Sequence, residues 1–513
     1  MGSDNSSWQG TLCIEVSPVP NTIIIFGASG DLAQRKLIPA LFNLSRRNLF
    51  HVKSRIIGCS RSPMDDNSFR DVQRKALKER FPSCELSEID AFLEKIFYIA
   101  GGYDSQDTYR GIYRKLLELE HEQDPVPNRT FYLATPAALY PIIVPMLAEF
   151  QLTAENYEGI PWRHVVLEKP FGSDSDSAEK LDRLLHESLQ ERQIYRIDHY
   201  LGKETVQNIL MLRFANIIFE PVWNSHYIDN IQITVAESIG VEHRSGYYEK
   251  AGLLRDMFQN HMLEMLSLTA MEMPASFDAD AIRDEKLKLI KSIRPFPIKE
   301  LDKYIMRAQY TVGNGMPGYR EEEGVSNTST TETFVAAKFL IDNWRWRGVP
   351  FYLRSGKRLT KKVSEIAITF KRVPHSIFSE LRPEDLSADM LVLNVQPEEG
   401  MALSIQAKQP GPKLCMGRLS LDFKYAEVFG GDIPDAYERL LLDCMLGDQT
   451  LFIRSDVIAA AWRLFTPVLE AWSKFDGNNL NCPCHLRSYP AGSWGPEEAS
   501  QLLCGCTSCW RDL

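Results

Sequence analysis

Short, continuous runs of apolar residues alternate with amphipathic stretches over the first 200 residues of the chain. Uninterrupted apolar runs are typical of strands that are buried on both faces of a parallel sheet. These runs are residues 22–26, 55–59, 96–100, 130–135 and 163–168. Apolar positions recur at helical spacing in the stretches 66–80, 87–95, 136–150 and 175–190. Alternating strands and helices at this spacing predict a doubly wound α/β domain of the Rossmann type.

The pattern changes after about residue 200. Apolar and polar residues alternate over 231–235 and again over 366–370, which predicts antiparallel strands with one wetter face. Helical patterns cover 203–215, 253–271 and 436–446. We therefore expect a larger α+β domain with a mostly antiparallel sheet, and a domain boundary near residues 195–205. The predicted division is a loose leader at 1–20, the Rossmann-type domain at 21–199, the α+β domain at 200–490 and a cysteine-rich tail at 491–513.

A glycine loop, GASGDLAQRK at residues 27–36, follows the first predicted strand directly. Gly27 allows a tight turn, Gly30 lets backbone N–H groups approach a pyrophosphate, and Ala33 lets the next helix pack closely on the strand. The spacing is G-x-x-G-x-x-A, which departs from the commonest dinucleotide fingerprint, and Pro39 lies inside the predicted helix. A tight turn without a ligand is the alternative, but the position between strand and helix favours a nucleotide site.

The end of the second predicted strand indicates which nucleotide is bound. NAD sites usually place an acidic residue there to bind the ribose 2′-hydroxyl. In this chain Ser60 and Arg61 follow instead, and a guanidinium suits a 2′-phosphate. A solvated surface arginine is the alternative, but its position favours NADP.

Two further segments carry candidate chemistry. In RIDHYLGKE, residues 196–204, His199 and Lys203 are four apart and with Tyr200 could converge on one anion, although scattered surface charge is an equal alternative. In the helical stretch 253–271, His261 falls within the apolar stripe. A lone histidine there is more often a core residue than a catalyst. Asp256 lies one helical turn before His261, and Glu237 ends the preceding predicted strand. Carboxylates near the imidazole favour a functional role for His261.

Taken together, these strings resemble the glucose-6-phosphate dehydrogenase family, in its bacterial rather than its animal form. The resemblance runs from about residue 21 to about 497. It is carried by GASGDLAQRK, EKPFG (168–172), RIDHYLGKE, the stretch from Gly246 through Asp256 to QNH (259–261), GVPFYLRSGKR (348–358), PDAYERL (434–440), FIRSD (452–456) and AWRLFTPVL (461–469).

The resemblance implies oxidation of D-glucose 6-phosphate at C1 with hydride transfer to NADP, which gives 6-phosphoglucono-1,5-lactone and NADPH in the oxidative pentose phosphate pathway. It implies that His261 is the general base and Asp198 its carboxylate partner. The implied cofactor-binding residues are Gly27, Ala28, Ser29, Gly30, Asp31, Leu32, Arg61 and Lys169. The implied substrate-binding residues are Lys169, His199, Tyr200, Lys203, Glu237, Asp256, Lys357 and Lys362. It also makes Lys169–Pro170 a candidate cis peptide, which an X-Pro bond permits.

Departures from the family pattern concern two regions. Asn394 stands where animal relatives have arginine, which argues against the second, structural NADP site of those relatives. Lys362 also stands where they have arginine, a change that keeps the positive charge but loses the planar guanidinium group. The second region is the C-terminal tail, whose five cysteines are Cys482, Cys484, Cys504, Cys506 and Cys509. We expect plain free thiols and no metal, with a zinc site or redox regulation as the alternatives.

Composition limits the remaining possibilities. The 513 residues are enough for two cores, and the formal net charge of −10 argues against nucleic-acid or anionic-membrane partners. No stretch has the roughly 18 apolar residues of a membrane span, and the first residues lack the pattern of a secretory signal. We therefore expect a cytoplasmic protein with reduced thiols, and the family implies a homodimer or homotetramer. A non-catalytic sugar-phosphate or nucleotide-binding regulator, and a dehydrogenase for a related hexose, stay as alternatives.

Overall fold

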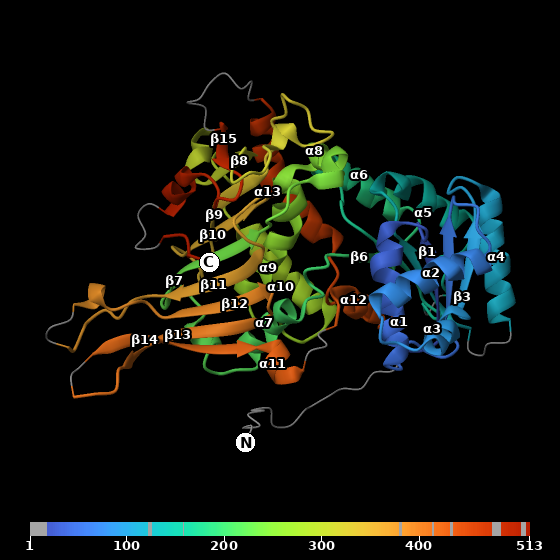
Figure 1. The fold of residues 1–513 in the computed structure, drawn as a ribbon, viewed down its shortest axis with the longest axis horizontal. Helices are drawn as coiled ribbons and strands as arrows, with labels where there is room; N and C mark the ends of the chain where they lie inside the picture. The colour runs from blue at the N-terminus through green and yellow to red at the C-terminus, as the bar shows by residue number, and fades with distance from the viewer. Residues whose placement is uncertain are drawn as a thin grey trace.

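The computed structural model describes residues 18–121, 126–156, 159–378, 382–412, 415–430, 434–474, 484–503 and 509–513. Nearly all of the predicted leader, residues 1–20, lies outside the described residues. Two sheets organise the chain, and Figure 1 shows them side by side, with the N-terminal sheet coloured from blue to green. Among the helices in these ranges, none is both long and apolar enough to cross a membrane.

The N-terminal sheet has six strands in the order β3-β2-β1-β4-β5-β6, and all of its pairs are parallel. This is the doubly wound order. Strands β2 and β3 are added on one side of β1 and strands β4 to β6 on the other side, so the strand order reverses between β1 and β4. The strands are β1 Asn21–Phe26, β2 Arg55–Ser60, β3 Ile96–Ala100, β4 Asn128–Leu133, β5 Arg163–Leu167 and β6 Ile194–Arg196. The predicted Rossmann-type fold is confirmed, and the five predicted strands agree with β1–β5 to within about two residues.

The helices of this domain are α1 Ile38–Arg46, α2 Asp66–Arg80, α3 Leu86–Leu93, α4 Gln106–Glu120, α5 Tyr140–Glu149 and α6 Ser175–His186. Helix α4 is absent from the predicted set. A π-helical segment, η1 at Ala33–Leu37, precedes α1. It places Pro39 within the first turn of α1, where the missing N–H of a proline is tolerated. The proline that breaks a local rule in the sequence therefore lies at a position that suits it.

The second sheet has nine strands in the order β14-β13-β12-β11-β7-β10-β9-β8-β15. Most pairs are antiparallel, as expected, but β7 pairs with β10, and β8 with β15, in parallel. The strands are β7 Ile228–Ala236, β8 Ile305–Thr311, β9 Phe334–Leu340, β10 Pro350–Gly356, β11 Val363–Phe370, β12 Met390–Gln396, β13 Gly400–Lys408, β14 Met416–Lys424 and β15 Leu486–Pro490.

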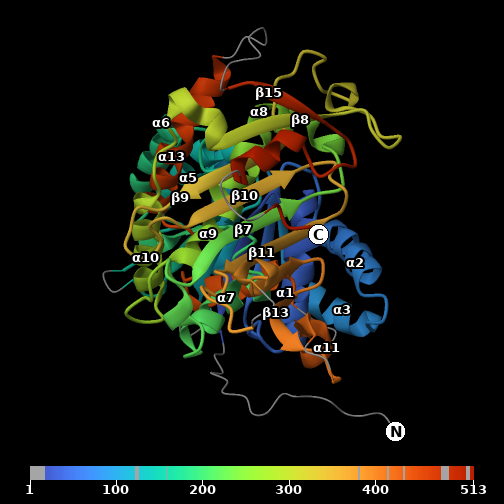
Figure 2. The same ribbon diagram turned by 90° about the vertical axis from the view of Figure 1, so that its left-hand side faces the viewer.

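Helices α7, α9, α10 and α13 lie between this sheet and the N-terminal domain, as the two views in Figure 1 and Figure 2 show. The helices of this half are α7 Glu204–Phe214, α8 Ser245–Leu253, α9 Leu263–Ala270, α10 Ala279–Ser292, α11 Tyr425–Phe429, α12 Ala436–Leu446 and α13 Ser455–Ser473. One face of the sheet is thus covered by helices.

The predicted helix at 253–271 is not one regular α-helix. Its first half is a π-helix, η6 at Leu254–Met262, and α9 continues from Leu263. Gly252 precedes it with φ +65°, and a Cβ at that position would lie 2.4 Å from the Glu332 carboxylate. The apolar stripe that predicts a helix is present, but it does not distinguish a π turn from an α turn.

Candidate active site

The proposed site residues of the N-terminal domain lie at one edge of its sheet. Gly27 follows β1, Lys169 comes two residues after β5, and Asp198 comes two residues after β6. Because all strands are parallel, their carboxyl ends meet at the same edge. Ligands of doubly wound folds bind in the crevice outside that edge. The topology therefore brings together groups that are separated by up to 171 positions in sequence.

The glycine loop has the shape of a nucleotide cradle. Gly27 has φ +85°, and a Cβ there would lie 2.4 Å from the carbonyl oxygen of Ala134, at the end of the neighbouring strand β4. A Cβ on Gly30 would lie 3.1 Å from the Gly27 oxygen. Glycine at these two positions lets the loop turn tightly against the end of β4. A tight glycine turn that leads into a helix N-terminus is the arrangement that binds the pyrophosphate of a dinucleotide, so the loop fits that group.

The other loop residues take different positions around the cradle. Ala28 is buried beneath the loop, Ser29 is exposed, and Leu32 is partly buried. Asp31 is exposed and forms an ion pair with Arg35 at 2.6 Å. All of the predicted loop residues thus surround the same turn, with polar atoms on its outer side.

Hydroxyl groups and a cation gather at the end of β2. The Oγ atoms of Ser29 and Ser60 lie 2.6 Å apart, and the Ser62 hydroxyl contacts Ser29 at 3.1 Å. Arg61 lies between Ser60 and Ser62 in sequence and is exposed. The sequence expectation that an arginine replaces the usual acidic residue at this strand end agrees with its position beside the glycine loop.

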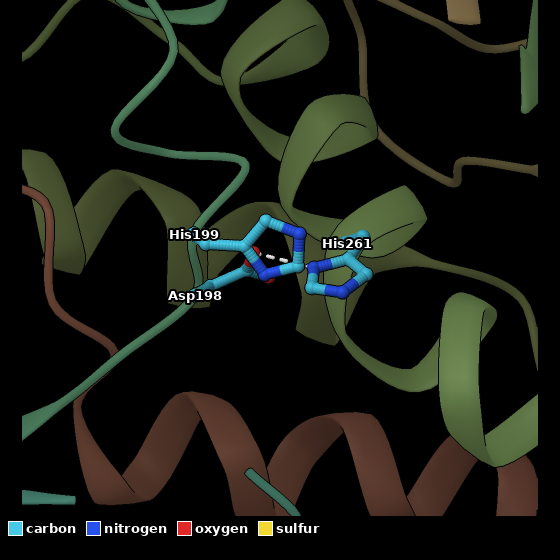
Figure 3. Close-up of side chains that lie close together, drawn as sticks. All are labelled: Asp198, His199 and His261. Atoms are coloured by element: carbon cyan, nitrogen blue, oxygen red, sulfur yellow. Dashed lines mark hydrogen bonds and ion pairs between the residues drawn. The ribbon is translucent and has the colours of Figure 1, made fainter. Parts of the chain in front are cut away.

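Asp198 and His261 form a buried pair, each about 1% exposed. The Nδ1 atom of His261 lies 2.5 Å from Oδ1 of Asp198, as Figure 3 shows, and the same oxygen accepts a 2.9 Å hydrogen bond from the Tyr200 backbone N–H. Burial lowers the pKa of His261 below its ordinary value, and Asp198 acts against this. Burial favours the neutral form of Asp198, yet its pKa is lowered by the attraction of His261.

The π-helix η6 brings Asp256 to the same junction. Asp256 and His261 are five residues apart, and in an α-helix such residues lie about 140° apart around the axis. A π-helix pairs residues i and i+5, which places them one above the other. Lys169 Nζ lies 2.8 Å from His261 Nε2 and 3.1 Å from Asp256 Oδ1. Lys169 is therefore joined to the candidate base and to a sugar-binding candidate at once, and the Lys169–Pro170 bond is cis, as the resemblance implies.

His199, Tyr200 and Lys203 converge, as the sequence suggests. The ring of His199 lies 4.6 Å from that of His261, and Lys203 Nζ lies 4.6 Å above the Tyr200 ring. Burial lowers the pKa of Lys203 to about 8, and the Lys362 charge contributes in the same direction. Burial also holds the pKa of His199 well below its ordinary value. These groups form a cluster of donors beside the base, in which Lys203 supplies the positive charge.

The second sheet contributes the remaining candidates. Because β7 and β10 are parallel, Glu237 after β7 and Lys357 after β10 leave the sheet at the same edge, and they form a 2.6 Å ion pair. The antiparallel strand β11 begins there, directly after Lys362, which is exposed. The one parallel pair in the middle of this sheet thus directs two of the predicted substrate-binding residues to one place.

Two residues in contact with the site, Gln396 and Tyr247, are absent from the sequence-based set. Gln396 accepts a hydrogen bond from Lys203 at 2.7 Å and donates to Ser364 at 2.7 Å. Tyr247 donates to Asp256 Oδ1 at 3.2 Å. Tyr247 falls within the family string that begins at Gly246, so the sequence carries a signal for it. No sequence signal connects Gln396 to Lys203, because they are 193 positions apart.

The cysteine-rich tail is only partly within the described residues, because Cys482, Cys504 and Cys506 lie outside them. Cys484 is buried, and Cys509 is exposed with its carbonyl accepting a 3.0 Å hydrogen bond from Gln232. The choice between free thiols, a zinc site and redox regulation stays a prediction.

Comparison with known proteins covers nearly the whole chain. The family described as "Glucose-6-phosphate dehydrogenase, NAD binding domain" matches residues 24–208, and "Glucose-6-phosphate dehydrogenase, C-terminal domain" matches 210–511. A glucose-6-phosphate 1-dehydrogenase of Chlamydia pneumoniae is 43% identical over 502 residues, 96% of each chain. One from Rhizobium meliloti is 43% identical over 508 residues, 97% of this chain and 99% of that protein.

Solved structures agree with this assignment. A glucose-6-phosphate dehydrogenase in complex with its substrate glucose-6-phosphate superimposes with a TM-score of 0.88 at 35% identity, and the match covers 97% of this chain and 100% of that one. Glucose-6-phosphate 1-dehydrogenase from Mycobacterium avium gives a TM-score of 0.80 at 34% identity, covering 96% and 99%. With a Rossmann-type sheet, a buried Asp198–His261 pair and both family domains present in order, the chain belongs to the glucose-6-phosphate dehydrogenase family.

Proposed function

We propose that the chain oxidises D-glucose 6-phosphate at C1 with hydride transfer to NADP, which gives 6-phosphoglucono-1,5-lactone and NADPH. The observation that carries the proposal is the junction at which Lys169 lies 2.8 Å from His261 Nε2 while Asp198 holds Nδ1 at 2.5 Å. A regulator without catalysis would have no need of a base held in this way. Full-length likeness to glucose-6-phosphate dehydrogenases supports the substrate.

His261 accepts the proton of the C1 hydroxyl at Nε2. Because Asp198 accepts a hydrogen bond from Nδ1–H, the lone pair of the neutral ring lies on Nε2. Burial lowers the pKa of His261, so the ring is neutral and able to accept a proton at pH 7. Asp198 then stabilises the imidazolium. Held at the glycine loop of residues 27–32, NADP would supply the acceptor for the hydride that leaves C1.

The Lys169 ammonium has to move away from His261 Nε2 before the sugar can react. Its ammonium occupies the place from which the C1 hydroxyl would approach, and it is also held by the Asp256 carboxylate and the Asp256 carbonyl oxygen at 2.9 Å. Asp256 and Glu237 offer acceptors for sugar hydroxyls. We therefore assign Lys169 to the boundary between the sugar and the nicotinamide, as the family resemblance implies.

The 6-phosphate is assigned to His199, Tyr200 and Lys203, with Lys357 and Lys362 adding positive charge from the second sheet. Charge-assisted hydrogen bonds to phosphate oxygens are shorter and stronger than neutral ones. Burial lowers the pKa of Lys203 to about 8, close to neutral pH. Its charge therefore sets the pH range over which the phosphate is held.

NADP rather than NAD is proposed from the end of β2. Arg61 and the hydroxyls of Ser29 and Ser62 are donors suited to a 2′-phosphate, and the position following the strand carries no carboxylate. The pathway assignment, the oxidative pentose phosphate pathway, follows from the product and is part of this proposal. The cytoplasmic location stays a prediction.

Self-association is proposed through the second sheet. Its terminal strand β14 is almost wholly exposed, and the side chains of Leu419 and Leu421 are about half exposed. Exposed leucines on the edge strand of a sheet are typical of a surface that a second subunit covers in an oligomer. Light scattering should give the mass of a dimer or tetramer, and a monomeric mass at micromolar concentration would contradict the proposal.

The decisive assay follows absorbance at the NADPH band. Turnover is expected with glucose 6-phosphate and NADP, and much less with glucose or with NAD. No turnover with the preferred pair, in protein that binds both ligands by calorimetry, would instead identify a non-catalytic regulator. Faster turnover with another hexose phosphate would reassign the substrate.

A further inference from the structure

A carboxylate that the mechanism does not use lies beside Lys169, at the boundary between the two halves of the molecule. Glu168 follows β5 and directly precedes Lys169. Its Oε1 atom accepts hydrogen bonds from the Tyr132 hydroxyl at 2.6 Å and from the Tyr437 hydroxyl at 3.3 Å. Tyr132 lies on β4 of the Rossmann-type domain and Tyr437 on α12 of the second domain.

A third tyrosine fixes the backbone of the same residue. The Tyr140 hydroxyl donates to the Glu168 carbonyl oxygen at 2.8 Å and accepts from the Glu168 N–H at 3.0 Å. Both the main chain and the side chain of Glu168 are therefore held. Since Lys169 is the next residue, its starting point is fixed before its side chain extends to His261 and Asp256.

Tyr437 also faces the phosphate-binding candidates. Its ring is parallel to that of His199, with the planes 6° apart and the centroids 6.4 Å apart. The N-terminus of α12 is tied to the helix behind the glycine loop, because Asp435 accepts a 2.6 Å hydrogen bond from Lys36. A continuous series of contacts therefore joins the nucleotide loop, α12, Glu168 and Lys169.

Burial of the Glu168 carboxylate is unfavourable in free energy, and packing alone does not explain why a carboxylate lies at this position. Isolated buried charges are unfavourable, and apolar residues of similar volume often replace buried polar groups without loss of stability. Burial raises the pKa of Glu168, while the tyrosine hydroxyls and Lys169 oppose that change. Two phenol donors that converge on one oxygen are a specific arrangement, and the residue that they hold directly precedes Lys169.

We propose that Glu168 is a positioning residue for the dehydrogenation, which joins Tyr132 of one domain to Tyr437 of the other and thereby fixes the backbone from which the Lys169 side chain reaches the boundary between the sugar and the nicotinamide. The inference rests on the proposed function and extends it to a residue that touches neither substrate nor cofactor. Loss of the Tyr437 bond releases the second domain from Glu168. The backbone at Lys169 is then less firmly placed at the boundary between the sugar and the nicotinamide, and the hydride step slows.

The test compares Tyr437→Phe and Glu168→Gln with Tyr109→Phe. Tyr109 is a matched control, because it is a buried tyrosine whose hydroxyl donates a 2.7 Å hydrogen bond to the Tyr103 carbonyl inside the Rossmann-type domain. Misplacing a reacting group by about 1 Å can cost on the order of 100-fold in rate. We expect kcat to fall on the order of 10-fold to 100-fold in the first two variants, and to stay within about twofold in the control.

Three further readouts separate positioning from general weakening. The affinity for NADP, measured by fluorescence titration, should be unchanged in Tyr437→Phe. The isotope effect with substrate deuterated at C1 should rise, because hydride transfer becomes rate-limiting. In a variant that carries both Glu168→Gln and Tyr437→Phe, the two reductions in kcat should not multiply, because both substitutions remove the same contact. Losses that multiply would contradict the proposed pair.

The outcomes distinguish this inference from the proposed function. A wild-type protein that does not oxidise glucose 6-phosphate overturns the function, and the inference with it. An active wild type with normal kcat and isotope effect in Tyr437→Phe overturns the inference alone. So does an equal loss of kcat in Tyr109→Phe at matched melting temperature. If Glu168→Gln does not fold, Tyr437→Phe still decides the question.

Discussion

Replacing Asp198 by asparagine isolates the charge of the buried pair from its geometry. Oδ1 of Asp198 accepts hydrogen bonds from both His261 Nδ1 and the Tyr200 backbone N–H. The carbonyl oxygen of the introduced side-chain amide can accept the same two bonds. The ring orientation and the tautomer should therefore survive in Asp198→Asn, and only the negative charge opposite the forming imidazolium is lost.

The size of the effect follows from the attraction between two unit charges. At a separation of about 4 Å and an effective dielectric constant of about 20, this attraction is about 4 kcal/mol. Each 1.36 kcal/mol corresponds to a factor of about 10 in rate. Because part of the hydrogen bond remains, we expect kcat to fall by roughly 10²- to 10³-fold. The KM for glucose 6-phosphate should change little, since Asp198 is buried behind the base.

The pH profile gives an independent check. In the parent protein the pKa of His261 is lowered by burial and supported by Asp198, so kcat/KM should be flat at pH 7 and decline only below the ordinary histidine value of about 6.5. Removing the negative charge lowers the pKa further, because the protonated ring loses its partner. The acidic limb of kcat/KM should therefore shift to lower pH in Asp198→Asn.

Asp443→Asn is the matched control for this experiment. Asp443 is a similarly buried carboxylate on α12, where it pairs with Arg439, and its pKa is raised by burial to about 7. Its replacement should leave kcat within about twofold. A rate in Asp198→Asn within about fivefold of the parent, with an unmoved acidic limb, would refute the assignment of His261 as the base.

Four other expectations can be checked with the same assay and with ligand titrations. Lys203→Met should raise the KM for glucose 6-phosphate by roughly 10- to 100-fold, as expected for loss of a charged hydrogen bond, and an unchanged KM would count against the phosphate assignment. In the parent protein that KM should rise as the pH passes above about 8, because the Lys203 ammonium, which attracts phosphate below its pKa, is then deprotonated; a KM that is constant to about pH 9.5, well past that pKa, would contradict this. Arg61→Ala should reduce kcat/KM for NADP by at least about 10-fold and leave that for NAD nearly unchanged, so an equal loss with both cofactors would argue against a 2′-phosphate contact. Gly27→Ala should abolish NADP binding or folding, because its Cβ would lie 2.4 Å from the Ala134 oxygen. Calorimetric NADP titration and a melting curve check this, and normal NADP affinity with a normal melting temperature would contradict a nucleotide site at the glycine loop.

The sequence predicts the Rossmann-type strands well because each is a continuous apolar run, and such runs have few alternative structures. Helix α4 is harder to recognise, since its buried residues Tyr109, Ile112 and Leu116 form a narrow stripe among many charged neighbours. The π-helix η6 could not be predicted, because a stripe of apolar residues is compatible with either an α or a π turn.

The catalytic pair shows why sites are harder to derive than strands. Asp198 and His261 are 63 positions apart, and neither spacing nor composition connects them. Their association depends on how the end of β6 meets η6, which is a tertiary contact. Family resemblance supplied the pair, and the geometry agrees with it. Gln396 and Glu168 were outside that resemblance-based set, and only the folded structure reveals their contacts.

The π-helix at Leu254–Met262 makes the winding of this segment as important as its side chains. If the same residues wound as a regular α-helix, Asp256 and His261 would no longer lie on one face, and Lys169 could not reach both. Every functional residue would still be present, and the segment would still be helical. A measurement of helical content, such as circular dichroism, would therefore not reveal whether the site is assembled, whereas activity would.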